Sequence, residues 1–500
     1  MTEPPTDTKP PASPDRQDDG SPWQHWWNRE CGGRQIIALA LPLMISTLSY
    51  SLMQFCDRMF LAWDSPTALA AVMPAGVMAW TLMSFPFGVA LYTNVFVAQY
   101  FGAQKPKRIS SVIVNGLMLG LCFSPIFITS IIWPSWIFDL AGHSGAVAQQ
   151  EAIYFRYVSI GSVAHILSAV LSSFFIGLGR TPMVMKVDVC SAGLNVVLDW
   201  LLIFGFTWSG SVLIEPLGIQ GAAIATTIAL WCKALVYFLL IYGSRKNRVE
   251  FGFSKNFSIN WGLIKRMLKF GSANGLQFLI ECLGFAIFTL MIARLGELPA
   301  AATTVAISVN MMVFVPIWGL STAVSTIVGQ QIGNGRPSMA ERATWTSLQI
   351  GLIYTGFFAA LYLLLPNLFL WGHDAGAENF EAIAEISRWL LVFVAAYCLF
   401  DTIQIVFVAA IKGAGDIRFV VVISLVCSSL FVGFGWLGYR FCDSELAQLY
   451  WWWTALTLWI VSLSIIFGWR FLDGRWKSMH VIEQELISAD PELADSSLAN

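Results

Sequence analysis

The stretch Val95–Pro106, VFVAQYFGAQKP, has a second copy at Thr326–Pro337, TIVGQQIGNGRP. The two align without a gap, so that Gln99 matches Gln330. At the same offset Phe60–Val72 (FLAWDSPTALAAV) aligns with Met291–Thr303 (MIARLGELPAAAT), and further on Gly177-Leu-Gly179 matches Gly413-Ala-Gly415. A hydrophobic chain built as two parallel halves is typical of a secondary transporter, in which two helix bundles move about a central site.

The composition indicates that lipid surrounds most of the chain. Of the 500 residues 56% are hydrophobic and 12% are charged, whereas soluble proteins carry about 25% charged residues. The apolar segments are too long for the ~10-residue alternating strands of a transmembrane β-barrel. The nine cysteines occur singly, so neither a zinc site nor a disulfide framework is expected. The sequence contains no nucleophile–base motif that would indicate an enzyme. Neither a nucleic-acid partner nor a cofactor is expected, apart from a coupling ion.

Twelve membrane helices are predicted, each long enough for the ~20 residues that a helix needs to cross a bilayer. They run near 36–62, 69–97, 110–139, 152–178, 183–206, 217–242, 264–294, 301–329, 343–370, 382–412, 418–440 and 447–472. The fold class is therefore all-α, with two six-helix lobes around a central cleft. The predicted lobes are an N-terminal lobe at residues 35–242 and a C-terminal lobe at residues 264–472, joined by a cytoplasmic linker at residues 243–263. A disordered and interfacial segment, residues 1–34, precedes them, and a cytoplasmic tail, residues 473–500, follows. The tail is acidic and is expected to be solvated from Ile482 onward.

Lysine and arginine set the predicted orientation, because cytoplasmic loops carry an excess of these residues. The loops after the second, fourth, sixth, eighth and tenth spans are basic, whereas the alternate loops are nearly free of basic residues. Both termini are therefore expected in the cytoplasm, with the protein in the cell membrane. Trp451–Trp453 are then expected at the outer membrane interface.

Ionisable residues inside the membrane are costly, which makes each one a candidate for function. Asp57 and Asp199 lie at similar depth in the first and fifth spans, and Asn195 shares a helical face with Asp199 and Asp188. Two carboxylates and an amide oxygen can bind Na⁺, or the carboxylates can share a proton; a purely structural hydrogen-bond cluster is the alternative. Asp188 is expected to pair with Lys186.

The second half carries a different acidic pair. Glu281 and Asp401 lie at comparable depth in the seventh and tenth spans, whereas Phe431 and Gly435 align with Asn195 and Asp199. The internal alignment also places His165 opposite Asp401. Such a histidine is either a hydrogen-bonded packing residue or a proton site.

The motifs resemble those of the multidrug and toxic compound extrusion (MATE) family. LALPLMISTLSYSLMQFCDRMFLA is similar to its first helix, with Pro42 at the family's proline and Asp57 at its acidic position, and VAQYFGAQ and VGQQIGNG resemble its repeated element. GLGRTP, LNVVLDWLLIFG and LGIQGAAIAT are similar to its fifth and sixth helices, and LQFLIECLGFAIFTLMIARLG and FDTIQIVFVAAIKGAGD to its seventh and tenth. Glu281 and Asp401 suggest the NorM-like branch.

The resemblance implies two lobes around a V-shaped cleft and export driven by Na⁺ or H⁺. It places ion coupling on Asp57, Asn195 and Asp199 in one lobe and on Glu281 and Asp401 in the other, with Pro42 as a helix hinge. The expected substrates are organic cations or drugs, with membrane lipids as surroundings and a monomer as the working unit. The alternatives are a flippase for lipid-linked precursors or polysaccharides, which the scarcity of basic residues away from helix ends disfavours, and a membrane enzyme or receptor.

Overall fold

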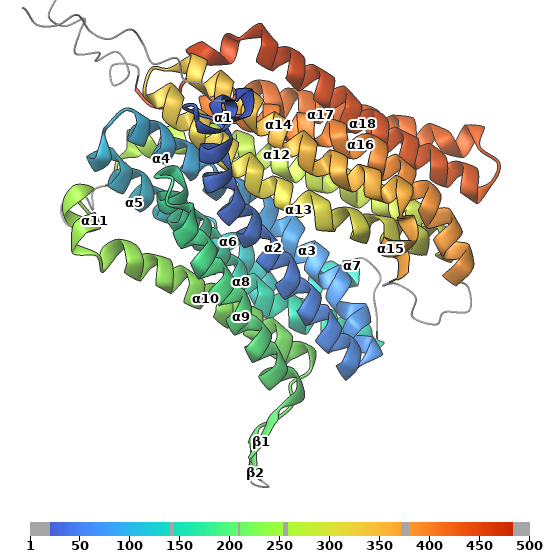
Figure 1. Cartoon of the computed structure of the whole chain (residues 1–500). Coiled ribbons are helices and arrows are strands. Elements are labelled where there is room, and N and C mark those ends of the chain that lie inside the picture. The colour runs from blue at the N-terminus through green and yellow to red at the C-terminus, as the bar shows by residue number, and fades with distance from the viewer. Residues whose placement is uncertain (1–20, 141–144, 209–210, 254–258, 372–379, 484–500) are drawn as a thin grey trace, which may run out of the picture.

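The computed structural model describes residues 21–140, 145–208, 211–253, 259–371 and 380–483 (Figure 1). Among these residues are twelve helices long and apolar enough to cross a membrane, as the sequence predicts. Residues 1–20 of the predicted N-terminal segment and the part of the acidic tail beyond residue 483 lie outside the described residues.

The first half begins with a short helix, followed by six spans. The elements are α1 (Pro22–Asn28), α2 (Gly33–Asp64), α3 (Pro66–Leu91), α4 (Thr93–Gly102), α5 (Pro106–Cys122), α6 (Ser124–Ile132), α7 (Trp136–Leu140), α8 (Gly145–Gly177), α9 (Thr181–Phe204), β1 (Phe206–Trp208), β2 (Ser211–Ile214) and α10 (Ile219–Tyr242). The second span consists of α3 and α4, which are separated at Tyr92, and the third consists of α5 and α6.

The second half repeats this order with fewer breaks. After α11 (Arg245–Glu250) come α12 (Trp261–Ala293), α13 (Glu297–Gly333), α14 (Pro337–Leu364), α15 (Pro366–Leu370), α16 (Phe380–Ala414), α17 (Ile417–Phe441), α18 (Glu445–Asp473) and a 3₁₀ helix, Arg475–Ser478.

Local sequence explains where several spans begin and end. Ser65 caps α3 by accepting a hydrogen bond from the Thr67 N–H at 3.2 Å, and Pro66 occupies the first turn, where its missing N–H costs nothing. The repeat-related Gly179 and Gly415 both have positive φ, +73° and +113°, just after α8 and α16. Only glycine adopts these conformations without strain, so the repeat preserves the geometry with which the chain leaves these two helices.

The twelve spans form two bundles. In the first, α8 packs on α3 and α10, and α2 packs on α9; in the second, α16 packs on α13, α14 and α18. Contacts between the bundles run from α2 and α4 to α13 and from α3 to α12. The bundles lie together at the end that holds α1, α4 and α11 and diverge toward the β1–β2 hairpin and α15 (Figure 1). The loops predicted to be cytoplasmic therefore meet at the closed end.

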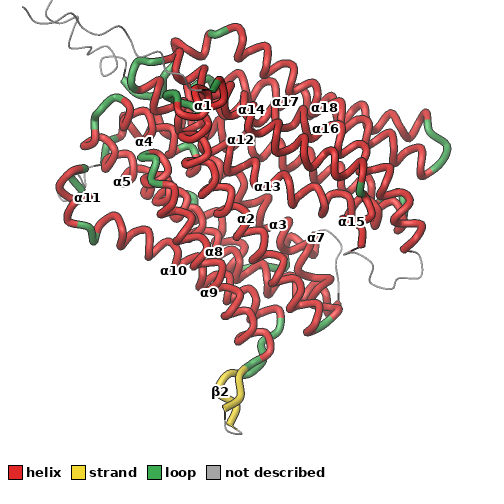
Figure 2. Tube along the Cα trace, viewed as in Figure 1, coloured by secondary structure: helices red, strands yellow, loops and turns green. Residues whose placement is uncertain are grey.

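Two features differ from the prediction, and a third, the loop between the fifth and sixth spans, is one for which the sequence analysis carried no expectation. The loop between the fifth and sixth spans is an antiparallel hairpin that projects beyond the helices (Figure 2). Trp452 and Trp453 are 1% and 0% exposed rather than interfacial, because they pack with Phe288 and Phe431 inside the second bundle. Ile482, expected in solvent, is 4% exposed because the chain after α18 turns back onto the helices.

Candidate functional site

The three predicted N-lobe residues come together inside the first bundle. Asp57 on α2 is 3% exposed, and Asn195 and Asp199 on α9, which packs against α2, are fully buried. The charges of Asp57 and Asp199 are close enough to act on each other. The predicted convergence of these residues therefore matches their positions in the structure.

Neighbouring helices supply further polar partners to this cluster. The Tyr154 hydroxyl on α8 donates to Asp57 Oδ2 at 3.4 Å. In the amide orientation that satisfies both neighbours, Asn195 Nδ2 donates to Asp199 Oδ2 at 2.9 Å and Asn195 Oδ1 accepts from the Thr226 N–H of α10 at 3.2 Å. Sequence analysis missed Tyr154 and Thr226, because nothing local to them indicates which face of α8 or α10 meets α2 and α9.

Two carboxylate oxygens of the cluster have no partner. Asp57 Oδ1 and Asp199 Oδ1 are buried and accept no hydrogen bond from any described residue. No lysine or arginine in the described ranges forms an ion pair with either carboxylate. A buried charge without a partner is unfavourable, so the site fits an added proton or a cation with a preference for oxygen ligands.

Asp188 belongs to a separate and satisfied network. It forms an ion pair with Lys233 Nζ of α10 at 2.8 Å, accepts from the Tyr237 hydroxyl at 2.8 Å and accepts from the Ser46 hydroxyl of α2. The predicted pairing with Lys186 is wrong, because residues two apart on a helix point in different directions. Lys233 is one of the few basic residues that lie away from helix ends.

His165 lies on α8 among aromatic rings. Its ring centroid is 4.7 Å from that of Phe87, 5.6 Å from that of Tyr50 and 6.4 Å from that of Trp80. The charged group that acts on it is Lys233, not Asp401, its counterpart in the internal alignment. This environment fits a packing role better than pairing with a carboxylate of the other lobe.

The C-lobe residues also converge, on α12 and α16. Glu281 accepts from Gln277 Nε2 at 2.6 Å, and its charge acts on both Asp401 and Lys412. Lys412 lies in the last turn of α16, and its ammonium group is close enough to interact with Glu281. Each acidic pair therefore has one cation that acts on one of its carboxylates, Lys412 on Glu281 in the C-lobe and the exposed Arg58 on Asp57 in the N-lobe.

The two lobes differ at the repeat-related positions of the N-lobe cluster. Phe431 stacks on Trp459 with centroids 4.9 Å apart, and Gly435 lies against the ring of Trp452. The C-lobe thus fills with aromatic rings the place where the N-lobe holds Asn195 and Asp199.

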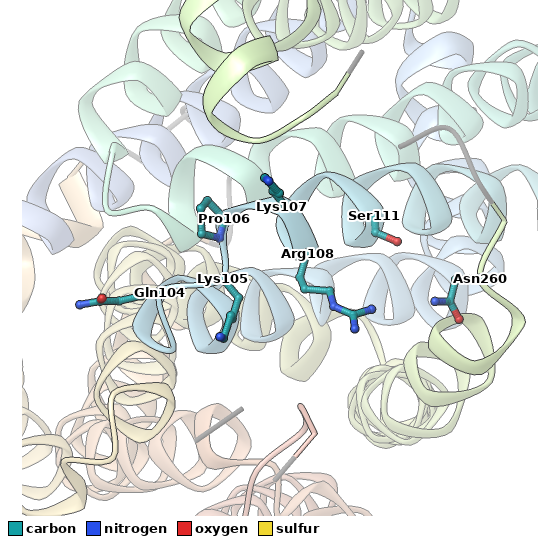
Figure 3. A pocket seen from close by; sticks show the side chains of 7 residues that line it. All are labelled: Gln104, Lys105, Pro106, Lys107, Arg108, Ser111 and Asn260. Atoms are coloured by element: carbon teal, nitrogen blue, oxygen red, sulfur yellow. The ribbon is translucent and has the colours of Figure 1, made fainter. Parts of the chain in front are cut away.

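The described chain also has a pocket of about 540 Å³ at the closed end, lined by Gln104, Lys105, Pro106, Lys107, Arg108, Ser111 and Asn260. Lys105 and Arg108 extend to one side of the first turn of α5 and Lys107 to the other (Figure 3). None of the residues that line this pocket is an intramembrane carboxylate. Its basic residues are those that the positive-inside rule places in a cytoplasmic loop.

Comparisons with known proteins agree with this architecture. The MatE family model matches residues 42–201 and 274–437, one stretch in each half. The chain is 26% identical to "Multidrug resistance protein NorM" of Vibrio vulnificus (strain YJ016), over 79% of this chain and 84% of the relative. It is also 26% identical to "Probable multidrug resistance protein NorM" of Bacillus cereus, over 88% of this chain and 94% of the relative.

Solved structures share the fold. An outward-facing multidrug resistance MATE family transporter of the MOP superfamily superimposes with a TM-score of 0.80 at 20% identity, covering 92% of this chain and 99% of that one. The eukaryotic MATE transporter AtDTX14 gives a TM-score of 0.75 at 19% identity, over 89% of this chain and 96% of that one.

Proposed function

Because the chain belongs to the MatE family, we propose that it is a secondary antiporter that exports organic cations and drugs in exchange for Na⁺ or H⁺. The names of its relatives support multidrug export. The observation that carries the coupling proposal is the pair Asp57 and Asp199, which is buried, has no ion-pair partner among the described residues and leaves two oxygens unsatisfied.

The N-lobe pair is the better candidate for ion coupling. Lys412, which is half-buried, acts on Glu281, whereas the cation that acts on Asp57 is the exposed Arg58, whose charge is screened more strongly by solvent. An ion or proton that enters the N-lobe cluster therefore neutralises charge for which the described residues provide no ion pair. The C-lobe pair then serves substrate cations or a second proton.

The position of Asp57 on α2 links the cluster to movement of the lobes. Pro42 lies inside the same helix, where it removes one backbone hydrogen bond. Near Pro42 the backbone of Leu43 and Met44 packs directly against Gly319 of α13 in the other lobe. Neutralisation of the cluster would alter how α2 is held in its own lobe, and a bend at Pro42 would transmit that change to α13.

The conformation fits a transporter open toward the outside. The bundles meet at the end with the basic loops, which the positive-inside rule assigns to the cytoplasm, and diverge at the other end (Figure 1). The protein thus works as a multi-pass protein of the cell membrane with both termini in the cytoplasm. Its two lobes are residues 35–242 and 264–472, and a monomer contains both sites.

An exporter of cations is favoured over a lipid-linked precursor flippase. A flippase needs free cationic groups to meet phosphate. Lys233, a cation in the interior of the N-lobe, is already paired with Asp188 at 2.8 Å. The free charges of the cluster are acidic, which matches positively charged cargo.

Purified protein in liposomes tests this function. We expect a fluorescent organic cation to move against its gradient when either a Na⁺ or a H⁺ gradient is imposed, and the effective gradient identifies the coupling ion. The double variant Asp57→Asn, Asp199→Asn should bind the dye but transport it only down its own gradient. Gradient-driven transport by this variant at the wild-type rate would disprove coupling at the cluster.

A further inference from the structure

The closed end of the molecule is held by two contacts that the internal repeat relates to each other. Gln99 Nε2 of α4 donates to the carbonyl of Gly413 in the other lobe at 2.9 Å. Gln330 Nε2 of α13 donates to the carbonyl of Gly177 in the first lobe, also at 2.9 Å. We call this contact zone between the lobes the seam.

Small residues allow the two backbones to meet at the seam. A Cβ atom on Gly102 would overlap the backbone of Gln330, and one on Gly333 would overlap the backbone of Gln99. The seam is therefore a direct contact of α4 with α13, and the lobes cannot separate at this end while both glutamine bonds remain.

A segment beyond the last membrane helix adds a third contact to only one of the two glutamines. The Val481 N–H donates to Gln99 Oε1 at 2.9 Å, a bond between residues 382 positions apart. Val481 and Ile482 are 1% and 4% exposed, and Val481 packs beside Gly415. Both polar atoms of the Gln99 amide are thus used: the nitrogen donates to the end of α16, and the oxygen accepts from the C-terminal segment.

Glu483 extends this segment across the seam. Its Oε2 accepts from the Tyr100 hydroxyl of α4 at 2.8 Å, and its Oε1 pairs with Arg266 Nη1 of α12 at 2.8 Å. Burial acts to raise the pKa of Glu483, but the bonds from Tyr100 and Arg266 outweigh it and hold the pKa below its ordinary value. One carboxylate therefore binds the N-lobe and the C-lobe at the same time.

The base of the segment is fixed to the C-lobe alone. Trp476 is fully buried and stacks on Phe471, with centroids 5.0 Å apart, and Lys477 Nζ pairs with Glu341 of α14 at 2.7 Å. The segment is thus anchored at one end and bridges the lobes at the other. This is the arrangement of a tether whose tip can leave while its base stays bound.

We propose that the seam contains a binding site for the chain's own segment His480–Glu483, formed by Gln99, Tyr100, Arg266 and Gly415, and that the bound segment holds the cytoplasmic end closed. The segment must leave before the lobes can separate at this end. It therefore controls how often the protein opens inward, and anything that captures the free segment favours opening. This inference rests on the alternating access proposed above.

Distance measurements between spin labels test the proposal without any transport assay. Lys107→Cys and Ser338→Cys, both exposed and on opposite sides of the seam, carry the labels in a background in which the exposed Cys122 and Cys190 are replaced by serine. In lipid nanodiscs, a chain ending at Met479 should show at least about tenfold more molecules with the long, open distance, as expected for the loss of the charge-assisted hydrogen bond from Tyr100 together with the ion pair to Arg266. Glu483→Gln, which keeps the chain length, should shift the population in the same direction by about threefold.

Two controls separate the seam from the rest of the tail. A chain ending at Glu483 retains every described contact, and Glu341→Gln removes a carboxylate that binds the tail only within the C-lobe. Both should give the wild-type distances. Equal distance distributions for the chains ending at Met479 and at Glu483, together with no shift for Glu483→Gln, would overturn the proposal. A shift in distances combined with an absence of ion-driven transport would retain the segment's role and reject the proposed function.

Discussion

Four buried or half-buried aspartates of the membrane region have different surroundings. Asp188 is satisfied by Lys233, Tyr237 and Ser46, whereas Asp57 and Asp199 each keep an unpartnered oxygen. Asp401 lies beside Glu281, with Lys412 near that glutamate. The residue type alone does not distinguish a structural ion pair from a candidate coupling site, whereas the hydrogen-bond and ion-pair partners of each carboxylate separate the satisfied groups from the unsatisfied ones.

The N-lobe carboxylates should be required for coupling and not for folding. We expect Asp199→Asn to abolish ion-driven efflux in liposomes while equilibrium binding of the substrate stays largely intact. The amide of asparagine can neither gain and lose a proton nor offer a negative charge to a cation. Asn195→Ala should weaken coupling less than either carboxylate change. Asp443→Asn, which alters an exposed carboxylate, is the matched control and should transport like the wild type. Undiminished ion-driven transport by Asp199→Asn would make the cluster structural.

Lys233 should matter for stability. Lys233→Met leaves Asp188 without its ion-pair partner, and breaking a buried pair costs about 3 kcal/mol. We expect a clear fall in Tm in detergent and partial recovery in the double variant Lys233→Met, Asp188→Asn, which removes both charges. Equal Tm values for the wild type and Lys233→Met would mean that the pair is not coupled to folding.

At the scale of elements, the breaks in the helices determine how the two halves meet. The second span changes from α3 to α4 at Tyr92, whose hydroxyl donates to the Lys412 carbonyl of the other lobe at 2.9 Å. The corresponding α13 runs unbroken from Glu297 to Gly333. The repeat thus preserves the seam contacts while the helices that carry them differ.

Gly102 should tolerate no larger residue. In Gly102→Ala the new methyl group meets the Gln330 backbone, so α4 and α13 must separate, and overpacking of this kind costs about 1–3 kcal/mol. We expect a lower Tm and a larger share of molecules with an open seam in the spin-label assay. Gly76→Ala is the control, because a Cβ there meets nothing within 4 Å. A closed seam in Gly102→Ala would show that the backbones do not need this close approach.

At the scale of the whole molecule, two similar frameworks hold different chemistry. The N-lobe keeps an acidic pair with two unsatisfied oxygens, and the C-lobe has aromatic rings at the matching positions and a different acidic pair, whose Glu281 interacts with Lys412. The C-terminal segment adds a further asymmetry, since it binds Gln99 of the first copy. Two equivalent bundles therefore support unequal roles for the lobes.

The orientation of the molecule can be tested from both sides of the membrane. In cells, a membrane-impermeant thiol reagent should leave Lys107→Cys and Ser338→Cys unlabelled and should label Asp443→Cys and Trp208→Cys. The two pairs lie at the basic, closed end and at the opposite end. Labelling of Lys107→Cys and Ser338→Cys from opposite sides would refute the parallel arrangement of the halves.

The sequence by itself determined the membrane-spanning helices, the twofold repeat and the candidate carboxylates. Hydropathy is a property of consecutive residues, and the cost of a charge in lipid applies wherever the side chain points. For the same reason the predicted limits of most membrane helices agree with those in the structure to within a few residues. Asp57, Asn195 and Asp199 could be grouped because the sequence gives their depth in the membrane and the helical face that Asn195 and Asp199 share.

Only the tertiary structure decided which polar groups meet. Tyr154 reaches Asp57 across 97 positions, Gln99 meets Val481 across 382, and Lys233 rather than the neighbouring Lys186 pairs with Asp188. These contacts depend on which face each helix turns toward its neighbours, and apolar helices that are hydrophobic all round carry no local signal of that face. Burial of Trp452, Trp453 and Ile482 has the same origin, because an aromatic or aliphatic side chain is equally compatible with lipid and with a packed bundle.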